Sequence, residues 1–420
     1  MPGDPHRSDR RPRLVVFTRV YPNAVQPNLG LFVRERMRRV AGHLDLVVVA
    51  PAPWFPFQGL LGRLSPHSRP PLPPRSEQQD GITVYHPRFF CVPGVLKWTD
   101  GFFLALGSLR LLRRLRREFR FDLIDAHFVY PDGVAARWLA RWLRRPYTIT
   151  LRGSLTRFAG SALHRRQINR ALSAAARVFS VADSLRQDAI AWGQAPGHVQ
   201  VVGNGADLAR FRPEDRAAAR QRLGLPQEGR FLVSVGGLTE RKGFHRVIAT
   251  LPELLHTQPD LHLVIAGGAT PEGNNEAELR EQVRTLGLEA RVWFLGQVAP
   301  DDLRFVYSAG DVFVLATRFE GWANVFLEAS ACGLPIVTTR VGGNAEVVNS
   351  DQVGIVVPYG DHDALRGALK EALERDWDRK AILAHARENA WETRIPQLVA
   401  AFEQIVAPDR AAAPGAARSG

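Results

Sequence analysis

The chain has 420 residues, of which 45% are hydrophobic and 23% charged, and its formal net charge is +13. These values are typical of a globular protein. The chain is too long for a single hydrophobic core, so we expect two domains of roughly 150 to 200 residues each. Its two cysteines, Cys91 and Cys332, exclude a disulfide framework, and no zinc-ligand spacing occurs among its histidines.

The surplus of positive charge favours acidic partners, namely nucleic acid, anionic lipid or phosphorylated substrates, although arginine-rich composition can also reflect a GC-rich genome. No nucleic-acid-binding motif accompanies the charge, so we expect no nucleic acid partner. Residues 1–13 lack the apolar stretch of a signal peptide, and prolines interrupt the longest uncharged run, 46–62. We therefore expect a cytoplasmic protein, either soluble or peripheral on the inner face of the membrane.

The chain begins with a predicted βαβ unit, made of a strand at 13–18, a helix at 31–40 and a strand at 44–50. Such a unit makes the sheet parallel, and parallel sheets bind ligands at the carboxyl ends of their strands. Gly30 lies in the long loop after the first strand, where a glycine lets the backbone approach a ligand. The other interpretation of Gly30 is an ordinary turn glycine.

Residues 51–80 are rich in proline and are predicted to be irregular, although Trp54, Phe55 and Phe57 are bulky for a loop. These aromatic residues either pack on the domain or form a surface for an acceptor or a lipid.

A helix predicted at 102–119 places leucines on one face and crowds arginines into its second half. One interpretation is a surface helix with a solvated face. The other is a basic amphipathic helix that docks on an anionic membrane surface. The sequence does not separate the two.

Two strand ends in the first half carry polar side chains. A strand at 121–127 ends at His127, and a strand at 147–151 is followed by Arg152. Both side chains therefore face the edge of the sheet at which ligands bind. Arg152 can donate hydrogen bonds or neutralise a phosphate, whereas a histidine at a strand end is more often structural.

The second half opens with a strand at 231–235 and a glycine-rich turn that includes Gly236, Gly237, Arg241 and Lys242, followed by a helix. A glycine-rich turn between a strand and a helix is a phosphate cradle, because its N–H groups and the helix N-terminus face the anion. It is not a P-loop, since the Lys-Ser/Thr ending is absent. The next predicted elements are strands at 261–266, 291–295 and 311–317 and helices at 276–286 and 301–309.

The stretch 319–329 holds two carboxylates, Glu320 and Glu328, among mostly apolar residues. Asn324 is predicted to cap a buried helix at 325–332. Glu328 then needs hydrogen-bond donors, because burying an unpaired charge is costly, while Glu320 precedes the helix, where free N–H groups favour anions. The two suit a polyhydroxyl ligand with a phosphate nearby. The alternative is a capping glutamate and a structural ion pair.

A compound pattern surrounds these carboxylates. It consists of Glu320, seven residues, Glu328, a run of small residues, Gly333, Pro335 and then Gly342-Gly343-x-x-Glu346. This pattern resembles the donor-sugar motif of family-4 retaining glycosyltransferases of the GT-B fold. The resemblance covers residues 13–406 and is weakest over 51–120.

The resemblance implies an α/β protein of the GT-B fold, with two doubly wound Rossmann-like domains that face a central cleft. The implied parts are disordered tails at 1–10 and 409–420, an N-terminal acceptor-side domain at 11–207, a C-terminal nucleotide-sugar-binding domain at 208–390 and a helix at 391–408 that crosses back.

The implied reaction is retaining transfer of a sugar from a nucleotide-diphosphate donor to an acceptor hydroxyl, in polysaccharide or glycolipid biosynthesis. The acceptor is a carbohydrate or a lipid-linked molecule. The resemblance assigns catalysis to Glu320, Lys242 and Arg152. It assigns donor binding to Gly30, Gly236, Gly237, Arg241, Lys242, Glu320, Gly321, Trp322, Ala323, Asn324 and Glu328, with His127, Gly342, Gly343 and Glu346 as further candidates. In particular, Glu320 would bind sugar hydroxyls and Glu328 the ribose.

The sequence departs from the family pattern at two functional positions. Arg152 stands where many members have a histidine that contacts the donor sugar, and Gly237 stands where they have an arginine that binds the diphosphate. Arg241 and Arg152 are the candidates to replace that arginine, and the sequence does not choose between them.

No general base or nucleophile stands out, which agrees with the front-face mechanism proposed for the family. No Asp-x-Asp site lies in a suitable loop, so we expect no metal cofactor. The alternatives to a transferase are an epimerase or phosphorylase of the same architecture and a non-catalytic nucleotide-sugar-binding protein.

Overall fold

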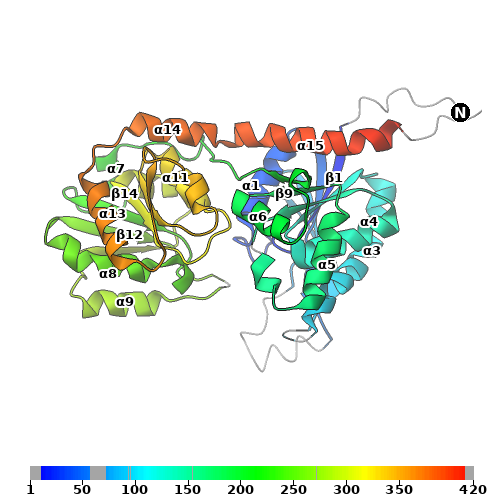
Figure 1. Cartoon of the computed structure of the whole chain (residues 1–420), viewed down its shortest axis with the longest axis horizontal. Helices are drawn as coiled ribbons and strands as arrows, with labels where there is room; N and C mark the ends of the chain where they lie inside the picture. The colour runs from blue at the N-terminus through cyan, green and yellow to red at the C-terminus, as the bar shows by residue number, and fades with distance from the viewer. Residues whose placement is uncertain are drawn as a thin grey trace, which may run out of the picture. The chain divides into compact units, whose positions relative to one another are not determined.

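The computed structural model describes residues 11–56, 72–92, 94, 96–153, 155–270 and 272–411. The chain folds into two compact units (Figure 1). The first unit runs to Gly203 and resumes at Ile395, and the second comprises Asn204–Arg394. The predicted boundaries at 207/208 and 390/391 lie a few residues from these positions. The predicted tail at 1–10, residue Phe57 and most of the predicted tail at 409–420 lie outside the described residues.

The first unit is built on a sheet of eight strands. In order across the sheet they are β10 (Val199–Val201), β9 (Arg177–Ser180), β8 (Tyr147–Leu151), β7 (Leu123–His127), β1 (Arg13–Phe17), β2 (Asp45–Val49), β5 (Ile82–Tyr85) and β4 (Ser76–Gln79). Only the β4–β5 pair is antiparallel among these neighbours. After their first residue, the central strands β1 and β2 are continuous apolar runs that are buried on both faces, as in other parallel sheets covered by helices.

Helices cover this sheet. They are α1 (Leu31–Val40), α3 (Asp100–Glu118), α4 (Val134–Leu143), α5 (Ala162–Ser173) and α6 (Asp183–Ala191). Helix α3 packs on α4, and α4 packs on α5, so that these three form one layer (Figure 1). The C-terminal helix α15 (Trp391–Ala411) adds Phe402, whose ring meets that of Phe179 in β9 edge-on at 5.6 Å.

The second unit is built on a parallel sheet of six strands. In order across the sheet they are β13 (Val292–Gly296), β12 (Leu261–Ala266), β11 (Arg230–Val235), β14 (Val312–Leu315), β15 (Ile336–Thr339) and β16 (Gly354–Val357). In chain order this arrangement is 3-2-1-4-5-6, the order of the doubly wound dinucleotide-binding fold.

Helices pack on both faces of this second sheet (Figure 1). Helices α8 (Phe244–Leu255), α9 (Glu276–Thr285) and α13 (His362–Glu374) form one layer, since α8 touches both others. The other layer holds α7 (Arg216–Arg222), α10 (Leu303–Ala309), α11 (Asn324–Ala331) and α14 (Arg379–Glu388), with the short α12 (Asn344–Val347) after β15.

Each sheet has one point at which the strand order reverses. In the first unit it lies between β1 and β7, and in the second between β11 and β14. The loops that leave neighbouring strands there go to opposite faces of the sheet, which opens a crevice at the carboxyl ends of the strands. Of the residues predicted to bind ligands, Gly30, the turn 236–242 and Glu320 lie in these loops. Arg152 follows β8, Gly342 and Gly343 follow β15, and Glu328 lies in α11.

The predicted α/β fold is confirmed, and the strands at 147–151 and 261–266 have the predicted bounds. The prediction of an irregular segment at 51–80 is wrong in part. Strand β3 (Ala52–Trp54) pairs with β6 (Arg88–Phe90) in a separate small sheet, and β4 forms an edge. Helices α5, α7 and α14 were not predicted, and α15 continues to Ala411, beyond its predicted end at 408.

Candidate active site

The loop after β11 places Lys242 at the reversal point of the second sheet. A short 3₁₀ turn, η6 (Glu240–Lys242), is followed by Gly243, whose φ of 78° is left-handed. A Cβ on Gly243 would lie 1.9 Å from the carbonyl oxygen of Ala316, so no other residue fits there. The aliphatic part of Lys242 passes over Gly236, and α8 begins directly after the turn.

The loop after β14 brings Glu320 to the same place. Its carboxylate is buried, with 7% of the residue exposed, and Oε1 accepts hydrogen bonds from Lys242 Nζ at 2.6 Å and from Arg241 Nη1 at 2.9 Å. Arg241 also donates to the carbonyl oxygen of Phe319 at 2.8 Å and to Glu272 Oε2 at 2.9 Å. The carbonyl oxygen of Arg241 in turn accepts from the Thr317 hydroxyl at 3.0 Å. The two loops are therefore joined by side chains and backbone.

The charges in this cluster leave one oxygen uncommitted. Burial lowers the pKa of Arg241, but the carboxylates of Glu320 and Glu272 outweigh it, and the net pKa is raised. Both cations bind the same atom of Glu320, Oε1. Within the described chain, Oε2 of Glu320 accepts no hydrogen bond from the protein, so it can accept one from a ligand hydroxyl.

The glycine pair after β15, Gly342 and Gly343, packs against the backbone of Glu320. Gly342 has a φ of 48°, and a Cβ there would lie 1.7 Å from the carbonyl oxygen of Glu320. The N–H of Gly343 donates to that same oxygen at 3.4 Å. Gly342 is therefore required for close packing against the Glu320 backbone. Glu346 is partly buried in the following short helix, α12.

Helix α11 begins one residue earlier than predicted. Ala323 occupies the N-cap position, and Asn324 is the first helical residue, so the prediction that Asn324 caps the helix is wrong. Its side-chain oxygen instead accepts from Asn204 Nδ2 at 2.9 Å, which ties α11 to the start of this unit. Gly321 is buried, and the partly buried Trp322 packs against the hydrophobic core.

Glu328 has the donor that its position on an apolar helix requires. The carboxylate is partly buried, and Oε2 accepts from the Tyr307 hydroxyl at 2.7 Å. Burial, together with the charge of Glu328, raises the pKa of Tyr307 well above its ordinary value, so the phenol keeps its proton and remains a donor.

The space beside Gly237 is occupied by another loop. A Cβ on Gly237 would lie 2.2 Å from Thr270 Cγ2, so an arginine at this position would displace Thr270. The same loop carries Glu272, the partner of Arg241. Of the two candidates for the missing diphosphate cation, Arg241 is the one that contacts Glu320, whereas Arg152 belongs to the first unit.

In the first unit, Arg152 and His127 form a buried polar chain. Arg152 is 9% exposed, and its Nε donates to His127 Nδ1 at 3.0 Å. His127 Nε2 lies 3.2 Å from Asp125 Oδ2, and Asp125 Oδ1 accepts from the Thr148 hydroxyl at 2.7 Å. The guanidinium of Arg152 also lies over the ring of Phe32, 5.1 Å from its centroid. His127 thus makes structural contacts, as histidines at strand ends more often do.

Burial is the main cause of the shifted pKa of His127. It lowers the pKa of His127 to about 4, helped by the positive charges of Arg152 and Arg36 and opposed by Asp125. His127 is therefore neutral near pH 7. Because its Nδ1 accepts from Arg152, its proton is on Nε2, facing Asp125.

Gly30 precedes α1 with a φ of 71°, and a Cβ there would lie 2.3 Å from the carbonyl oxygen of Val20. The chain itself therefore requires glycine at this position, whether or not a ligand approaches it.

Several contacts of the site were not predicted, and only one had a signal in the sequence. Asp125 and His127 lie two residues apart on one strand, which puts both side chains on one face. Tyr307, Glu272 and Thr270 come from distant segments without a recognisable pattern. Among the described residues, no group of three or more histidines, cysteines or acidic residues is placed to hold a metal ion.

Comparison with known proteins agrees with this architecture. The profile described as Glycosyl transferases group 1 matches residues 215–390, and that of Glycosyltransferase Family 4 matches residues 64–210. A D-inositol 3-phosphate glycosyltransferase of Kineococcus radiotolerans is 30% identical over 376 residues, 82% of this chain and 86% of the relative. The putative teichuronic acid biosynthesis glycosyltransferase TuaC of Bacillus subtilis is 29% identical over 370 residues, 86% of this chain and 88% of the relative.

Solved structures share the fold. A sucrose-phosphate synthase of Thermosynechococcus elongatus has a TM-score of 0.73 at 20% identity, covering 95% of this chain and all of that one. HepE of Anabaena, in complex with UDP, has a TM-score of 0.72 at 20% identity and covers 94% of this chain. Two doubly wound α/β units of this kind are the GT-B fold. The chain belongs to glycosyltransferase family 4.

The titration of His127 yields a first prediction. Since its pKa is about 4 in the folded chain and about 6.5 in an unfolded one, the unfolded chain binds more protons between these values. The free energy of unfolding should therefore decrease as the pH is lowered below about 6.5. His127 should contribute up to about 1.4 kcal/mol of this decrease per pH unit. In His127→Gln, this contribution to the pH dependence of the free energy of unfolding should be absent.

Urea unfolding at pH 7, 6 and 5 measures this slope. The stability gap between wild type and His127→Gln should narrow as the pH falls. The exposed His43 gives the control for loss of an imidazole, because His43→Gln should leave the free energy of unfolding at pH 7 unchanged. A gap that stays constant from pH 7 to pH 5 would contradict the assigned protonation of His127.

Proposed function

We propose that this glycosyltransferase takes a sugar from a nucleotide-diphosphate donor and transfers it, with retention of anomeric configuration, to an acceptor hydroxyl in polysaccharide or glycolipid biosynthesis. The observation that supports this most is the cluster of Arg241 and Lys242 on one oxygen of Glu320, at the reversal point of the second sheet. In this cluster, the cations Arg241 and Lys242 could bind a diphosphate. They lie beside Glu320 Oε2, which can accept hydrogen bonds from sugar hydroxyls.

The proposed chemistry follows from the charges that form during the reaction. As the glycosidic bond breaks, negative charge grows on the leaving diphosphate and positive charge on the sugar. Lys242, Arg241 and the N-terminus of α8 would stabilise the diphosphate without a metal ion. Glu320 Oε2 would hold sugar hydroxyls, and Glu328, oriented by Tyr307, would bind the ribose.

The contacts of Glu320 favour a role in binding over a role as nucleophile. Its Oε1 is already paired with two cations, which lowers its tendency to attack a carbon atom. We therefore propose the front-face course, in which the leaving phosphate takes the proton of the acceptor hydroxyl on the face from which it departs. That course gives retention without a covalent enzyme intermediate.

A donor panel tests this function directly. UDP-, GDP-, ADP- and CMP-sugars are compared by thermal shift, beginning with UDP-glucose because HepE of Anabaena was solved with that molecule. A ligand at about 100 times its Kd adds about 2.7 kcal/mol of stability and should raise the Tm. The active donor is then incubated with acceptor, and NMR should find the donor's anomeric configuration in the product. A product with the opposite configuration would refute retention, and an epimerised donor with no new bond would support an epimerase.

Lys242 gives the sharpest test of the chemistry. Because charge on the diphosphate grows toward the transition state, Lys242→Ala should lower kcat, by a factor on the order of 10² to 10³, and not only raise KM. Lys242→Arg should recover part of the loss, since its planar fork needs a different geometry. Steady-state kinetics with saturating acceptor measure both.

The exposed Lys370 on α13 provides the matched control, and Lys370→Ala should keep the kcat of the wild type. A kcat for Lys242→Ala within about threefold of the wild type would remove Lys242 from the catalytic machinery and point to Arg241 or Arg152 as the phosphate partner.

We also propose that the basic side of α3 attracts the protein to an anionic membrane surface. Leu104, Leu112 and Leu115 on the apolar side of this helix are buried in the core. Its exposed side carries Arg110, Arg113, Arg114, Arg116 and Arg117. The attraction through α3 would thus be electrostatic. No helix among the described residues is long and apolar enough to cross a membrane.

Neutralising four arginines tests this attraction. Replacing Arg113, Arg114, Arg116 and Arg117 with Gln should weaken binding to anionic vesicles strongly, at about 1 kcal/mol per charge near the surface, with the effect fading at high salt. Cosedimentation with vesicles measures it, and transfer to a water-soluble acceptor should be unchanged. Equal sedimentation of variant and wild type would refute the proposal.

A further inference from the structure

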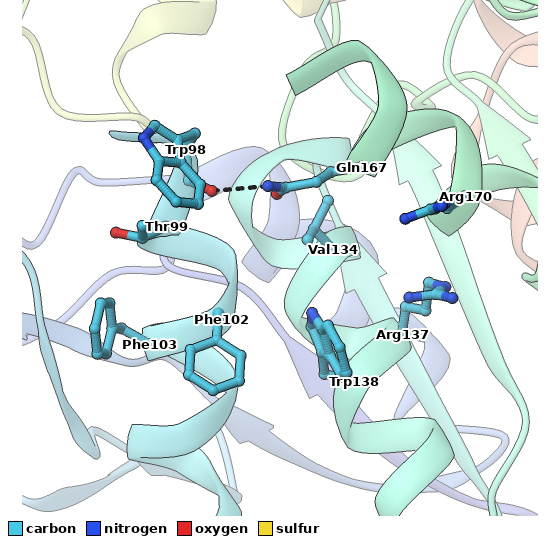
Figure 2. Close-up of a pocket in the computed structure, with 9 residues that line it drawn as sticks. All are labelled: Trp98, Thr99, Phe102, Phe103, Val134, Arg137, Trp138, Gln167 and Arg170. Atoms are coloured by element: carbon cyan, nitrogen blue, oxygen red, sulfur yellow. Dashed lines mark hydrogen bonds between the residues drawn. The ribbon is translucent and has the colours of Figure 1, made fainter. Parts of the chain in front are cut away.

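A pocket of about 440 Å³ opens in the helical layer of the first unit, and none of the residues assigned to catalysis or donor binding lines it (Figure 2). Helices α3, α4 and α5 contribute its walls, together with Trp98 just before α3. The rings of Phe102, Phe103 and Trp138 lie along one side, and the guanidinium groups of Arg137 and Arg170 lie together at one end (Figure 2). Its volume is in the range of small-molecule sites, which is about 300–1,000 Å³.

The apolar side of the pocket is open to solvent. Phe102 is 42% exposed and Trp98 42%, and Leu106, one turn further along α3, is 50% exposed. The ring of Phe102 lies edge-on to those of Phe103 and Trp138, with centroids 5.8 Å away in each case. Large aromatic side chains gathered on a surface in this way mark an interaction site, because their exposure is unfavourable in water.

The polar end of the pocket is positively charged. None of its lining residues is acidic, and neither Arg137 nor Arg170 makes an ion pair within the described chain. Arg137 lies against Trp138, 5.7 Å from the ring centroid. An apolar wall that ends in two such guanidinium groups is complementary to a molecule with an apolar chain and an anionic head.

The pocket is continuous with the basic side of α3. Helical spacing puts positions 102, 106, 110, 113 and 117 in one row, and these are Phe, Leu, Arg, Arg and Arg. The exposed row is therefore aromatic and aliphatic beside the pocket and basic beyond it. Aromatic rings at the depth of lipid headgroups, flanked by arginines, are typical of proteins that lie on a membrane.

We propose that this pocket binds one anionic phospholipid of a bilayer, with the start of an acyl chain against Phe102, Phe103 and Trp138 and the phosphate on Arg137 and Arg170. The site adds an apolar anchor and a defined lipid contact to the electrostatic attraction by α3. It extends the membrane part of the proposed function, and it is independent of sugar transfer.

The test compares two ligands and two sets of variants. Vesicles of phosphatidylglycerol are compared with vesicles of phosphatidylcholine by cosedimentation. Dihexanoyl phosphatidylglycerol, kept below its critical micelle concentration, is titrated by calorimetry, with inorganic phosphate in parallel. The pocket variants are Phe102→Gln and the pair Arg137→Gln/Arg170→Gln. The control carries Gln at Arg113, Arg114, Arg116 and Arg117, which do not line the pocket.

The wild type should bind phosphatidylglycerol vesicles in preference to phosphatidylcholine and should bind the short-chain lipid at one site, without measurable binding of inorganic phosphate. Loss of the two pocket arginines should weaken vesicle binding by roughly thirtyfold. Phe102→Gln should weaken binding of both lipid forms. The control variant should lose vesicle affinity but keep the short-chain lipid. Because Phe102 is half exposed, its replacement should leave the Tm unchanged.

Three results would overturn the proposal. Pocket variants that bind vesicles and short-chain lipid like the wild type would show that the pocket takes no lipid. Binding of the short-chain lipid without vesicle binding would point to a soluble amphiphile or a lipid-linked substrate. Binding of inorganic phosphate as tight as that of the lipid would identify a free-phosphate site. Sugar transfer to a water-soluble acceptor, measured on the same variants, keeps these results separate from failure of the proposed enzymatic function.

Discussion

The carboxylate of Glu320 joins the two loops at the reversal point of the second sheet, and the geometry of the site depends on that junction. Lys242 and Arg241 both donate to its Oε1, across 78 and 79 residues of sequence. A carboxylate that is 7% exposed would be costly without such partners. Gly243 and Gly342 make the junction sterically possible, since a Cβ on either would collide with a backbone oxygen of the neighbouring loop.

The carboxyl edge of the first sheet also carries ionisable groups, and these are buried. Arg152 donates to His127 there, and His127 Nε2 lies 3.2 Å from Asp125 Oδ2. In the loop that follows β7, Asp132 accepts from the backbone N–H of Arg19 at 2.7 Å, and its burial raises the pKa of the carboxyl to about 6. These contacts rigidify the edge at which the sheet would present a ligand. The second unit places an uncommitted carboxylate oxygen, Oε2 of Glu320, beside the two cations Lys242 and Arg241, which suits the unit assigned to the donor.

The sequence predicted what depends on periodicity and local motifs. Apolar runs indicated the parallel strands, and the glycine-rich turn, Glu320 and Glu328 were recognised from spacing. It could not reveal contacts between distant segments, because pairs such as Tyr307 with Glu328 or Thr270 with Gly237 arise only when the sheet assembles. The error at Asn324 has the same cause: its side-chain oxygen accepts from Asn204, 120 residues away in the sequence, so it does not cap its own helix. Strands β3 and β4 were missed because prolines and polar residues hide their alternation.

The departure at Gly237 has a structural consequence for the proposed chemistry. With Thr270 filling the space of an arginine side chain, the second cation of the site is Arg241, four residues further along the turn. Arg241 shares Glu320 Oε1 with Lys242. A diphosphate that attracts either cation would weaken the pairing at Oε1 and leave the carboxylate with more capacity to accept sugar hydroxyls. Under the proposed function, the diphosphate and the sugar of one donor would thus bind cooperatively through a single carboxylate.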